Sequence, residues 1–217
     1  LPHEDVPFQL IDLPPISADY MESWIVNALQ PADAAILVVD LSDPECVEHV
    51  AVIGNRLDEK RVSLTARFER VEVAEDEAEL DPFRIYLPTL LVATKSDAIA
   101  DPQRELETFL ELAEIRFPSI YVSAEKDTDL ERVGAMLFEL LGVVRVYTKV
   151  PGKPADHSRP FTIRRGDTVQ EIARMVHRGM AQELKFARLW GRGAQFDGQQ
   201  VGRDHLLADG DVIELHL

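Results

Sequence analysis

The segment LPTLLVATKSD, residues 87–97, joins a continuous apolar run to four polar residues. An apolar run of this length is typical of a strand that is covered on both faces, as in a parallel sheet. Two further apolar runs end in the same way, because Ala34–Val39 is followed by Asp40 and Ser119–Val122 is followed by Ser123-Ala124. We therefore expect three strands with polar residues at their carboxyl ends, where layered α/β sheets bind ligands.

Helix patterns separate these expected strands. Helices are expected at Ser17–Leu29, at Pro44–Leu57, in PQRELETFLELAEIRF after Asp101, and from Thr128 or Asp129 to Leu141. Two more strands are expected at Val6–Ile11, ending at Asp12, and at Arg61–Val73, before an acidic loop at Glu72–Asp81. This alternation predicts an α/β domain with a mostly parallel sheet.

The distribution of charge divides the 217 residues into two parts. Residues 1–144 carry 11 basic and 30 acidic side chains, whereas residues 145–217 carry 12 basic and 9 acidic ones. We therefore expect two domains, at residues 1–144 and 145–217. In the second, strands are expected at Val146–Val150, Phe161–Ile163 and Ala187–Trp190, a helix from Thr168 to about Ala181, and a last strand VIELHL after the turn Asp209-Gly210.

Composition excludes several classes of protein. No stretch approaches the roughly 20 apolar residues that span a bilayer, so no membrane partner is expected. The single cysteine, Cys46, excludes a disulfide framework and favours a cytoplasmic location. None of the six histidines has the spacing of a zinc ligand set. The chain begins with Leu1 rather than Met, so we expect it to be a piece of a longer protein.

Three polar motifs follow expected strands along the chain. They are Asp12-Leu13-Pro14-Pro15, Thr94-Lys95-Ser96-Asp97 and Ser123-Ala124-Glu125. Their order and spacing resemble the third, fourth and fifth sequence motifs of the GTPases. The resemblance makes Thr94, Lys95, Asp97, Ser123 and Ala124 candidate nucleotide-binding residues and Asp12 a candidate metal-side residue.

Each motif suits a physical task in such a site. The carboxylate of Asp97 can accept two hydrogen bonds from N1 and N2 of guanine, a donor pair that adenine lacks. The stem of Lys95 can lie over the flat base. Ser123-Ala124 can offer a backbone N–H to guanine O6, and Asp12 can reach Mg²⁺ through water.

Longer segments narrow the resemblance to one family. Gly54-Asn55-Arg56-Leu57 resembles the segment after the third helix in the developmentally regulated GTP-binding proteins of the Obg type, and Phe83–Pro88 resembles the segment that leads into their fourth motif. The C-terminal part resembles the TGS domain of that family most closely. The matching segments are 145–149, 165–169, 176–178, 184–191, 201–205 and 207–215.

The resemblance implies a fold and a set of ligands. It implies a partial P-loop GTPase, Ras-like with a mostly parallel α/β sheet, in residues 1–144, and a small α+β β-grasp TGS domain in residues 145–217. It also implies binding of GTP or GDP with Mg²⁺. The TGS domain would contact the ribosome, an RNA or a protein partner, and its basic residues are candidates for that surface. They are Arg164, Arg165, Arg174, Arg178, Lys185, Arg188, Arg192 and Arg203.

Two departures from the family leave the activity open. The sequence contains no GxxxxGK[ST] loop to hold phosphates, and Pro15 replaces a glycine whose N–H contacts the γ-phosphate. Either a longer protein supplies the loop and its strand, or another element fills that place in the sheet. One hypothesis is therefore a GTP-binding protein with slow or altered hydrolysis. The alternative is a non-enzymatic TGS binding module attached to a truncated or degenerate GTPase domain.

Overall fold

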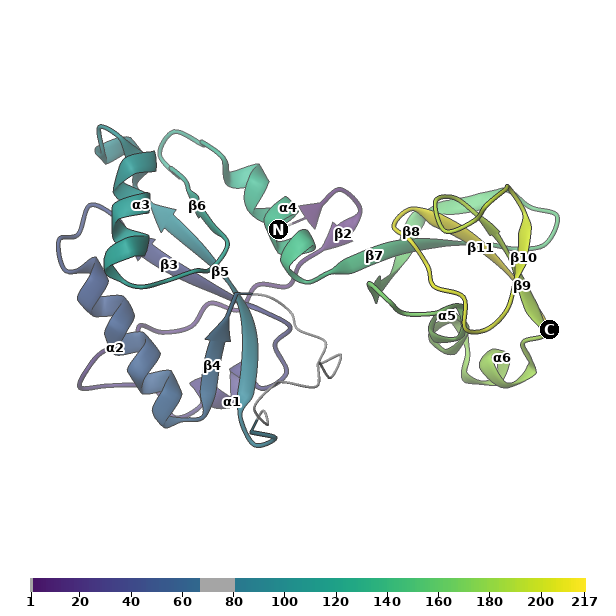
Figure 1. Cartoon of the computed structure of the whole chain (residues 1–217), viewed down its shortest axis with the longest axis horizontal. Coiled ribbons are helices and arrows are strands. Elements are labelled where there is room, and N and C mark those ends of the chain that lie inside the picture. Colours follow the sequence, from purple (N-terminus) through teal and green to yellow (C-terminus); the bar gives the residue numbers. More distant parts are fainter. Residues whose placement is uncertain (1, 67–80) are drawn as a thin grey trace. The chain divides into compact units, whose positions relative to one another are not determined.

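The computed structural model describes residues 2–66 and 81–217. The chain forms two compact units, and each is described by itself. One unit is Gln9–Leu141, and the other is Gly142–Leu217 together with the first eight residues (Figure 1).

The Gln9–Leu141 unit is built around strand β5 (Ile85–Thr94) (Figure 1). Strands β3 (Ala35–Asp40), β4 (Val62–Thr65) and β6 (Ser119–Tyr121) all pair with β5, and all three pairings are parallel. The side chains of β5 are almost wholly buried from Leu87 to Ala93, as the long apolar run predicts. The predicted α/β class with a mostly parallel sheet is therefore confirmed.

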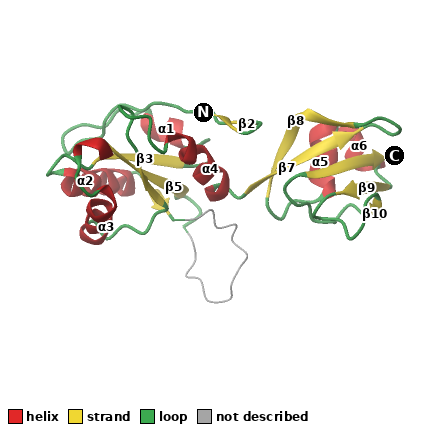
Figure 2. Cartoon of the chain, turned by 90° about the horizontal axis from the view of Figure 1, so that it is seen from above, coloured by secondary structure: helices red, strands yellow, loops and turns green. Residues whose placement is uncertain are grey.

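Helices cover this sheet and bury its apolar side chains. They are α1 (Ile25–Leu29), α2 (Cys46–Glu59), the short 3₁₀ helix η1 (Ser96–Ala98), α3 (Pro102–Leu112) and α4 (Leu130–Leu140). Helices α2 and α3 lie on the same side of β3 and β5 (Figure 2), where Leu37, Leu91 and Phe109 share one core. As predicted, Asp101 caps α3, since its carboxylate accepts a hydrogen bond from the Arg104 amide at 3.2 Å.

The strand predicted at Val6–Ile11 is wrong. Only β1 (Pro2–His3) and β2 (Val6–Pro7) form, as a two-residue antiparallel pair, and residues 8–16 adopt neither helix nor strand. A strand persists only where a neighbour pairs with its backbone, and Pro7 has no N–H to donate.

The first eight residues also differ from the expected domain division, because they pack with the C-terminal unit. Arg145 forms ion pairs with Glu4 and Asp5, and the hydroxyl of Tyr147 donates a hydrogen bond to Asp5 at 2.6 Å. These polar contacts explain why a segment so distant in sequence joins that unit.

Two other predicted elements are shorter than expected. The helix predicted at Ser17–Leu29 is confined to α1, because Ser17 forms a turn in which its amide donates to the Tyr20 carbonyl at 2.9 Å. Of the strand predicted at Arg61–Val73, β4 forms, while residues 67–73 lie outside the described residues, as does most of the acidic Glu72–Asp81 loop.

The C-terminal unit is a five-stranded mixed sheet with helices on one face (Figures 1 and 2). Its elements are β7 (Val143–Lys149), β8 (Ala155–Arg164), α5 (Val169–Val176), α6 (Arg178–Glu183), β9 (Phe186–Trp190), β10 (Gln199–Val201) and β11 (Asp211–His216). The strand order is β10-β9-β11-β7-β8, and β11 runs parallel to β7 while the other pairs are antiparallel. Val146, Ile172, Leu189 and Ile213 are fully buried between the sheet and α5, which gives the predicted β-grasp arrangement.

The helix predicted from Thr168 to about Ala181 is interrupted. His177 has an extended backbone with φ −166° and separates α5 from α6, and its Nδ1 accepts a hydrogen bond from the Gly179 amide at 3.1 Å. A histidine that caps a new helix therefore stands where the sequence pattern suggested a continuous one.

Candidate functional site

Two of the predicted motifs meet at the carboxyl end of the parallel sheet. Lys95 follows β5 in the left-handed region, with φ 58° and ψ 33°, and turns the chain into η1. Thr94 Oγ1 donates to the Val39 carbonyl at 3.1 Å, and the Ser96 amide donates to the Val122 carbonyl at 3.2 Å. The Thr94–Asp97 motif is thus attached to β3 on one side and to the end of β6 on the other.

Asp97 and Ser123 form the centre of this arrangement. Ser123 is 1% exposed, and its Oγ donates to Asp97 Oδ1 at 2.5 Å. Ser123 Oγ also accepts a hydrogen bond from the Lys126 amide at 3.1 Å. The hydroxyl is therefore fixed both as a donor and as an acceptor. The Ser123 hydrogen bond lowers the pKa of Asp97 below its ordinary value.

Lys95 lies beside Asp40, a residue that the sequence placed at a strand end but not in the site. The Lys95 Nζ is 2.5 Å from Asp40 Oδ2. This contact raises the pKa of Lys95 and lowers that of Asp40, so each group stabilises the charged form of the other. The signal available in the sequence is the pattern Asp40-x-Ser42 directly after an apolar run.

The remaining two predicted site residues, Ala124 and Asp12, both among the described residues, make no hydrogen bond or ion pair with Asp97. Ala124 is exposed in the turn that follows β6, next to Ser123 in the chain. Asp12 is exposed in a segment without regular structure. Within residues 2–66 and 81–217, no group of three or more His, Cys, Asp or Glu side chains could hold a metal ion. A magnesium site at Asp12 stays a prediction, because Mg²⁺ is usually held by one or two carboxylates together with substrate phosphates.

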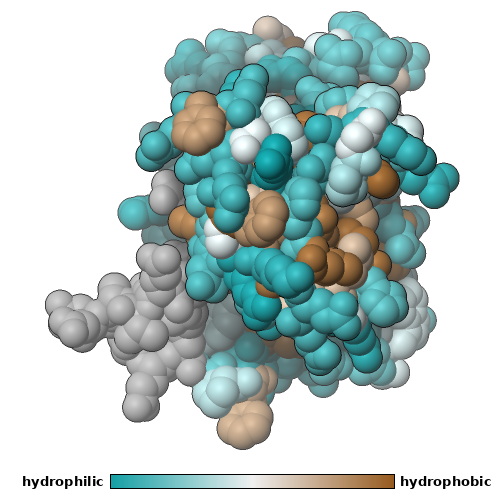
Figure 3. Space-filling view, turned by 90° about the vertical axis from the view of Figure 1, so that its right-hand side faces the viewer, coloured by the Kyte–Doolittle hydropathy of each residue, from teal (hydrophilic) through white to brown (hydrophobic). Residues whose placement is uncertain are grey.

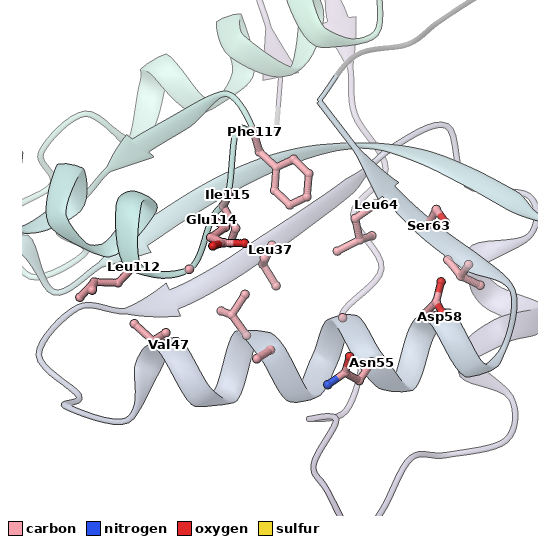
Figure 4. Close-up of a pocket in the computed structure, with 15 residues that line it drawn as sticks. Leu37, Val47, Asn55, Asp58, Ser63, Leu64, Leu112, Glu114, Ile115 and Phe117 are labelled. Carbon is pink, nitrogen blue, oxygen red and sulfur yellow. The ribbon is translucent and has the colours of Figure 1, made fainter. Parts of the chain in front are cut away.

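A groove of about 490 Å³ lies elsewhere in the same unit (Figure 4). The groove is lined by Val47 and Asn55 on α2 and by Ile115 and Phe117, which follow α3 (Figure 4). None of the predicted nucleotide-binding residues lines this groove. The candidate site at the carboxyl end of the sheet is therefore separate from this groove.

In the C-terminal unit, two of the basic residues singled out from the sequence contact other residues of the same unit. Arg203 donates to the carbonyl of Leu184 at 2.5 and 2.8 Å, and Arg174 pairs with Glu171 at 2.7 Å. Arg188 is exposed on β9. The surface in Figure 3 is mainly hydrophilic and is interrupted by small hydrophobic patches.

Comparison with known proteins identifies a known domain in this chain and finds relatives of the chain. The family model of the TGS domain matches residues 144–217. A GTP-binding protein of Methanocaldococcus jannaschii is 27% identical over 99% of this chain and 67% of its own length. The human developmentally-regulated GTP-binding protein 2 is 32% identical over 61% of this chain, a match that spans only 35% of the human protein.

Solved structures show the same fold. A GTP-binding protein from Pyrococcus horikoshii superposes with a TM-score of 0.62 at 17% identity, over 88% of this chain and 80% of that one. The YchF GTPase of Schizosaccharomyces pombe gives a TM-score of 0.60 at 10% identity, over 89% of this chain and 75% of that one. At these identities the likeness establishes the fold alone.

Proposed function

Because the chain belongs to the developmentally regulated, Obg-like GTP-binding protein family and ends in a TGS domain, we propose that its Gln9–Leu141 unit supplies the guanine-recognition part of a nucleotide-binding site. The observation that carries this proposal is the contact between Asp97 and Ser123. It brings together two motifs that are far apart in sequence, and it leaves an ionised carboxylate at the ligand-binding edge of the sheet.

The proposed chemistry of base selection follows from these atoms. Asp97 accepts hydrogen bonds from N1 and N2 of guanine, and the Ser123 hydroxyl orients the carboxylate. The Ser123 amide already donates to the Thr128 carbonyl at 3.3 Å, so we assign the bond to guanine O6 to the Ala124 amide. Thr94 and Lys95 complete the pocket, Thr94 through its anchor to β3 and Lys95 through its stem.

GTP hydrolysis is proposed only for a form of the protein that has a phosphate-binding loop, since this sequence contains no GxxxxGK[ST]. Pro15 cannot donate an N–H to the γ-phosphate, so we propose that turnover is slow or altered. Mg²⁺ at Asp12 stays a prediction, and no step of the proposed mechanism depends on it.

Titration with fluorescent GDP and GTP tests the proposal. The wild-type chain is expected to bind both in preference to ADP. Asp97→Asn is expected to lose guanine nucleotides and to gain xanthosine diphosphate, because an amide can donate to the xanthine O2. Asp43→Asn removes a neighbouring carboxylate that lies outside the site and serves as the control. Equal GDP affinity in Asp97→Asn and wild type would refute the proposed base recognition.

We also propose a binding role for the TGS domain, with the ribosome, an RNA or a protein as partner in the cytoplasm. The support is the excess of basic over acidic residues in residues 145–217. Gel-shift titration of the full chain with ribosomal RNA at 50 and 200 mM salt, with Arg188→Ala beside wild type, tests the RNA arm. If the chain does not bind ribosomal RNA at 50 mM salt, RNA is excluded as the partner.

None of the helices in residues 2–66 and 81–217 is long and apolar enough to cross a membrane.

A further inference from the structure

Both carboxylate oxygens of Asp40, at the end of β3, have partners. Its Oδ1 accepts two hydrogen bonds from Ser42, one from the amide at 2.9 Å and one from the hydroxyl at 2.6 Å. Its Oδ2 contacts Lys95 Nζ at 2.5 Å. Both oxygens are therefore engaged, one with the loop that follows β3 and the other with the loop that follows β5.

Backbone register explains why these two loops meet. Asp40 lies opposite Thr94 in the parallel pairing of β3 with β5, so Lys95 is the first residue beyond the paired region. Thr94 Oγ1 is bonded to the carbonyl of Val39, the residue before Asp40. Thr94, the last residue of β5, and Lys95, the first residue after it, are thus attached to two consecutive residues at the end of β3.

A lysine in this position would otherwise be mobile. The Lys95 side chain is 61% exposed, and a free lysine side chain loses rotamer entropy when it is fixed. A stem that packs over a base must first be ordered, and an ion pair made before the ligand arrives reduces that entropic cost of binding.

We propose that Asp40, fixed by Ser42, is a positioning residue that orders Lys95 for nucleotide binding and sets affinity without selecting the base. The inference rests on the proposed function, since it assigns a role within the same site. It separates two carboxylates: Asp97 reads the N1 and N2 donors of guanine, whereas Asp40 acts through the Lys95 ammonium and never touches the base.

The loop after β3 supplies a matched control. Asp43 also accepts a loop amide, from Glu45 at 2.9 Å, and pairs with His49 at 3.4 Å rather than with Lys95. Asp40→Asn and Asp43→Asn each remove one negative charge, at the last residue of β3 and in the loop that follows it. Only Asp40→Asn removes the contact with Lys95.

The binding experiment titrates wild type, Asp40→Asn, Asp43→Asn and Lys95→Met with fluorescent GDP and IDP. Inosine lacks the N2 donor, so the ratio of the two affinities reports on Asp97. We expect Asp40→Asn to weaken both nucleotides equally, by about two- to fivefold, as is usual for an exposed ion pair. In a Lys95→Met background, which keeps the stem but not the ammonium, Asp40→Asn should have no further effect.

A second measurement follows Lys95 without nucleotide. Lysines of the full chain are ¹³C-dimethylated, a change that preserves their charge, and the Lys95 signal is assigned by its loss in Lys95→Met. Removing the partner carboxylate in Asp40→Asn should lower the pKa of Lys95 toward its ordinary value, while Asp43→Asn should lower it less, because Asp43 acts on Lys95 without a direct hydrogen bond.

Each outcome decides between the two proposals. If wild type binds GDP and Asp40→Asn binds it equally well, the positioning role is wrong and the proposed function stands. If Asp40→Asn still weakens binding in the Lys95→Met background, Asp40 does not act through Lys95. An unchanged Lys95 pKa in Asp40→Asn overturns the ion pair itself. If wild type binds no GDP, the proposed function fails and the positioning role fails with it.

Discussion

Truncating Ile213 is expected to destabilise the C-terminal unit in proportion to the methyl groups removed. Ile213 is 0% exposed at the centre of β11 and packs in the core formed with α5. For such a site Ile213→Val costs about 1 kcal/mol and Ile213→Ala about 3 kcal/mol. In a unit of this size, each kcal/mol lowers the melting temperature by about 4–8 °C. The expected shifts are therefore about 4–8 °C for valine and about 12–24 °C for alanine.

The two tryptophans allow each unit to be followed separately. Trp24 belongs to the Gln9–Leu141 unit and Trp190 to the C-terminal unit, and the chain has no other tryptophan. Thermal unfolding is measured by fluorescence in a Trp24→Phe background and, separately, in a Trp190→Phe background. The neighbouring Val212→Ala, which changes a partly exposed residue on the other face of β11, is the control and should shift the transition less.

We propose that the two units unfold as separate domains, so that only the transition reported by Trp190 moves with Ile213. A shift of equal size in the transition reported by Trp24 would refute this reasoning. Addition of GDP should raise only the transition reported by Trp24, because a ligand stabilises only the unit that binds it. The experiment thereby tests the proposed domain division and the location of the nucleotide site together.

Two further predictions concern the C-terminal unit. A Cβ on Gly193 would lie 2.3 Å from Asp211 Oδ2, so Gly193→Ala should destabilise by about 1–3 kcal/mol in urea unfolding, whereas Gly202→Ala, with nothing within 4 Å, should be neutral. Hydrogen bonds from Arg145 hold the pKa of Asp209 below its ordinary value. The stabilisation that ionised Asp209 contributes is therefore present above its unfolded pKa of about 3.9 and is lost as pH falls through its folded pKa. Between about pH 4 and pH 2, the melting temperature of Asp209→Asn should fall less than that of wild type.

The central strands and the caps were predictable because local signals and tertiary packing agree. The apolar run at Leu87–Ala93 is longer than any solvent-exposed strand would tolerate, so burial on both faces follows directly. Asp101 precedes Pro102 at the start of an amphipathic pattern, and both residues favour a helix start for independent reasons. In such segments, local residues mark where the strand or helix begins and ends.

Segments that depend on a distant partner were not predictable. The apolar sequence of Val6–Ile11 is compatible with a buried strand, but its structure depends on which backbone lies beside it. The pairing of Asp5 with Arg145 and Tyr147 decides where this segment goes, and no local pattern reveals a contact across so much of the chain. The break at His177 has a similar origin, since a single side-chain cap competes with helix continuation.

The candidate site shows the same limit within a correctly predicted sheet. Parallel strands bring their carboxyl ends to one edge, so the sequence alone indicates that Asp40, Thr94 and Ser123 lie near one another. Which of them touch depends on register, and a shift of one residue would move Lys95 away from Asp40. Sequence motifs therefore identify the residues that select a base, whereas the residues that order them become visible only once the strands are aligned. The Asp40–Lys95 pair belongs to this second kind, and it can be perturbed without changing a single residue of the recognised motifs.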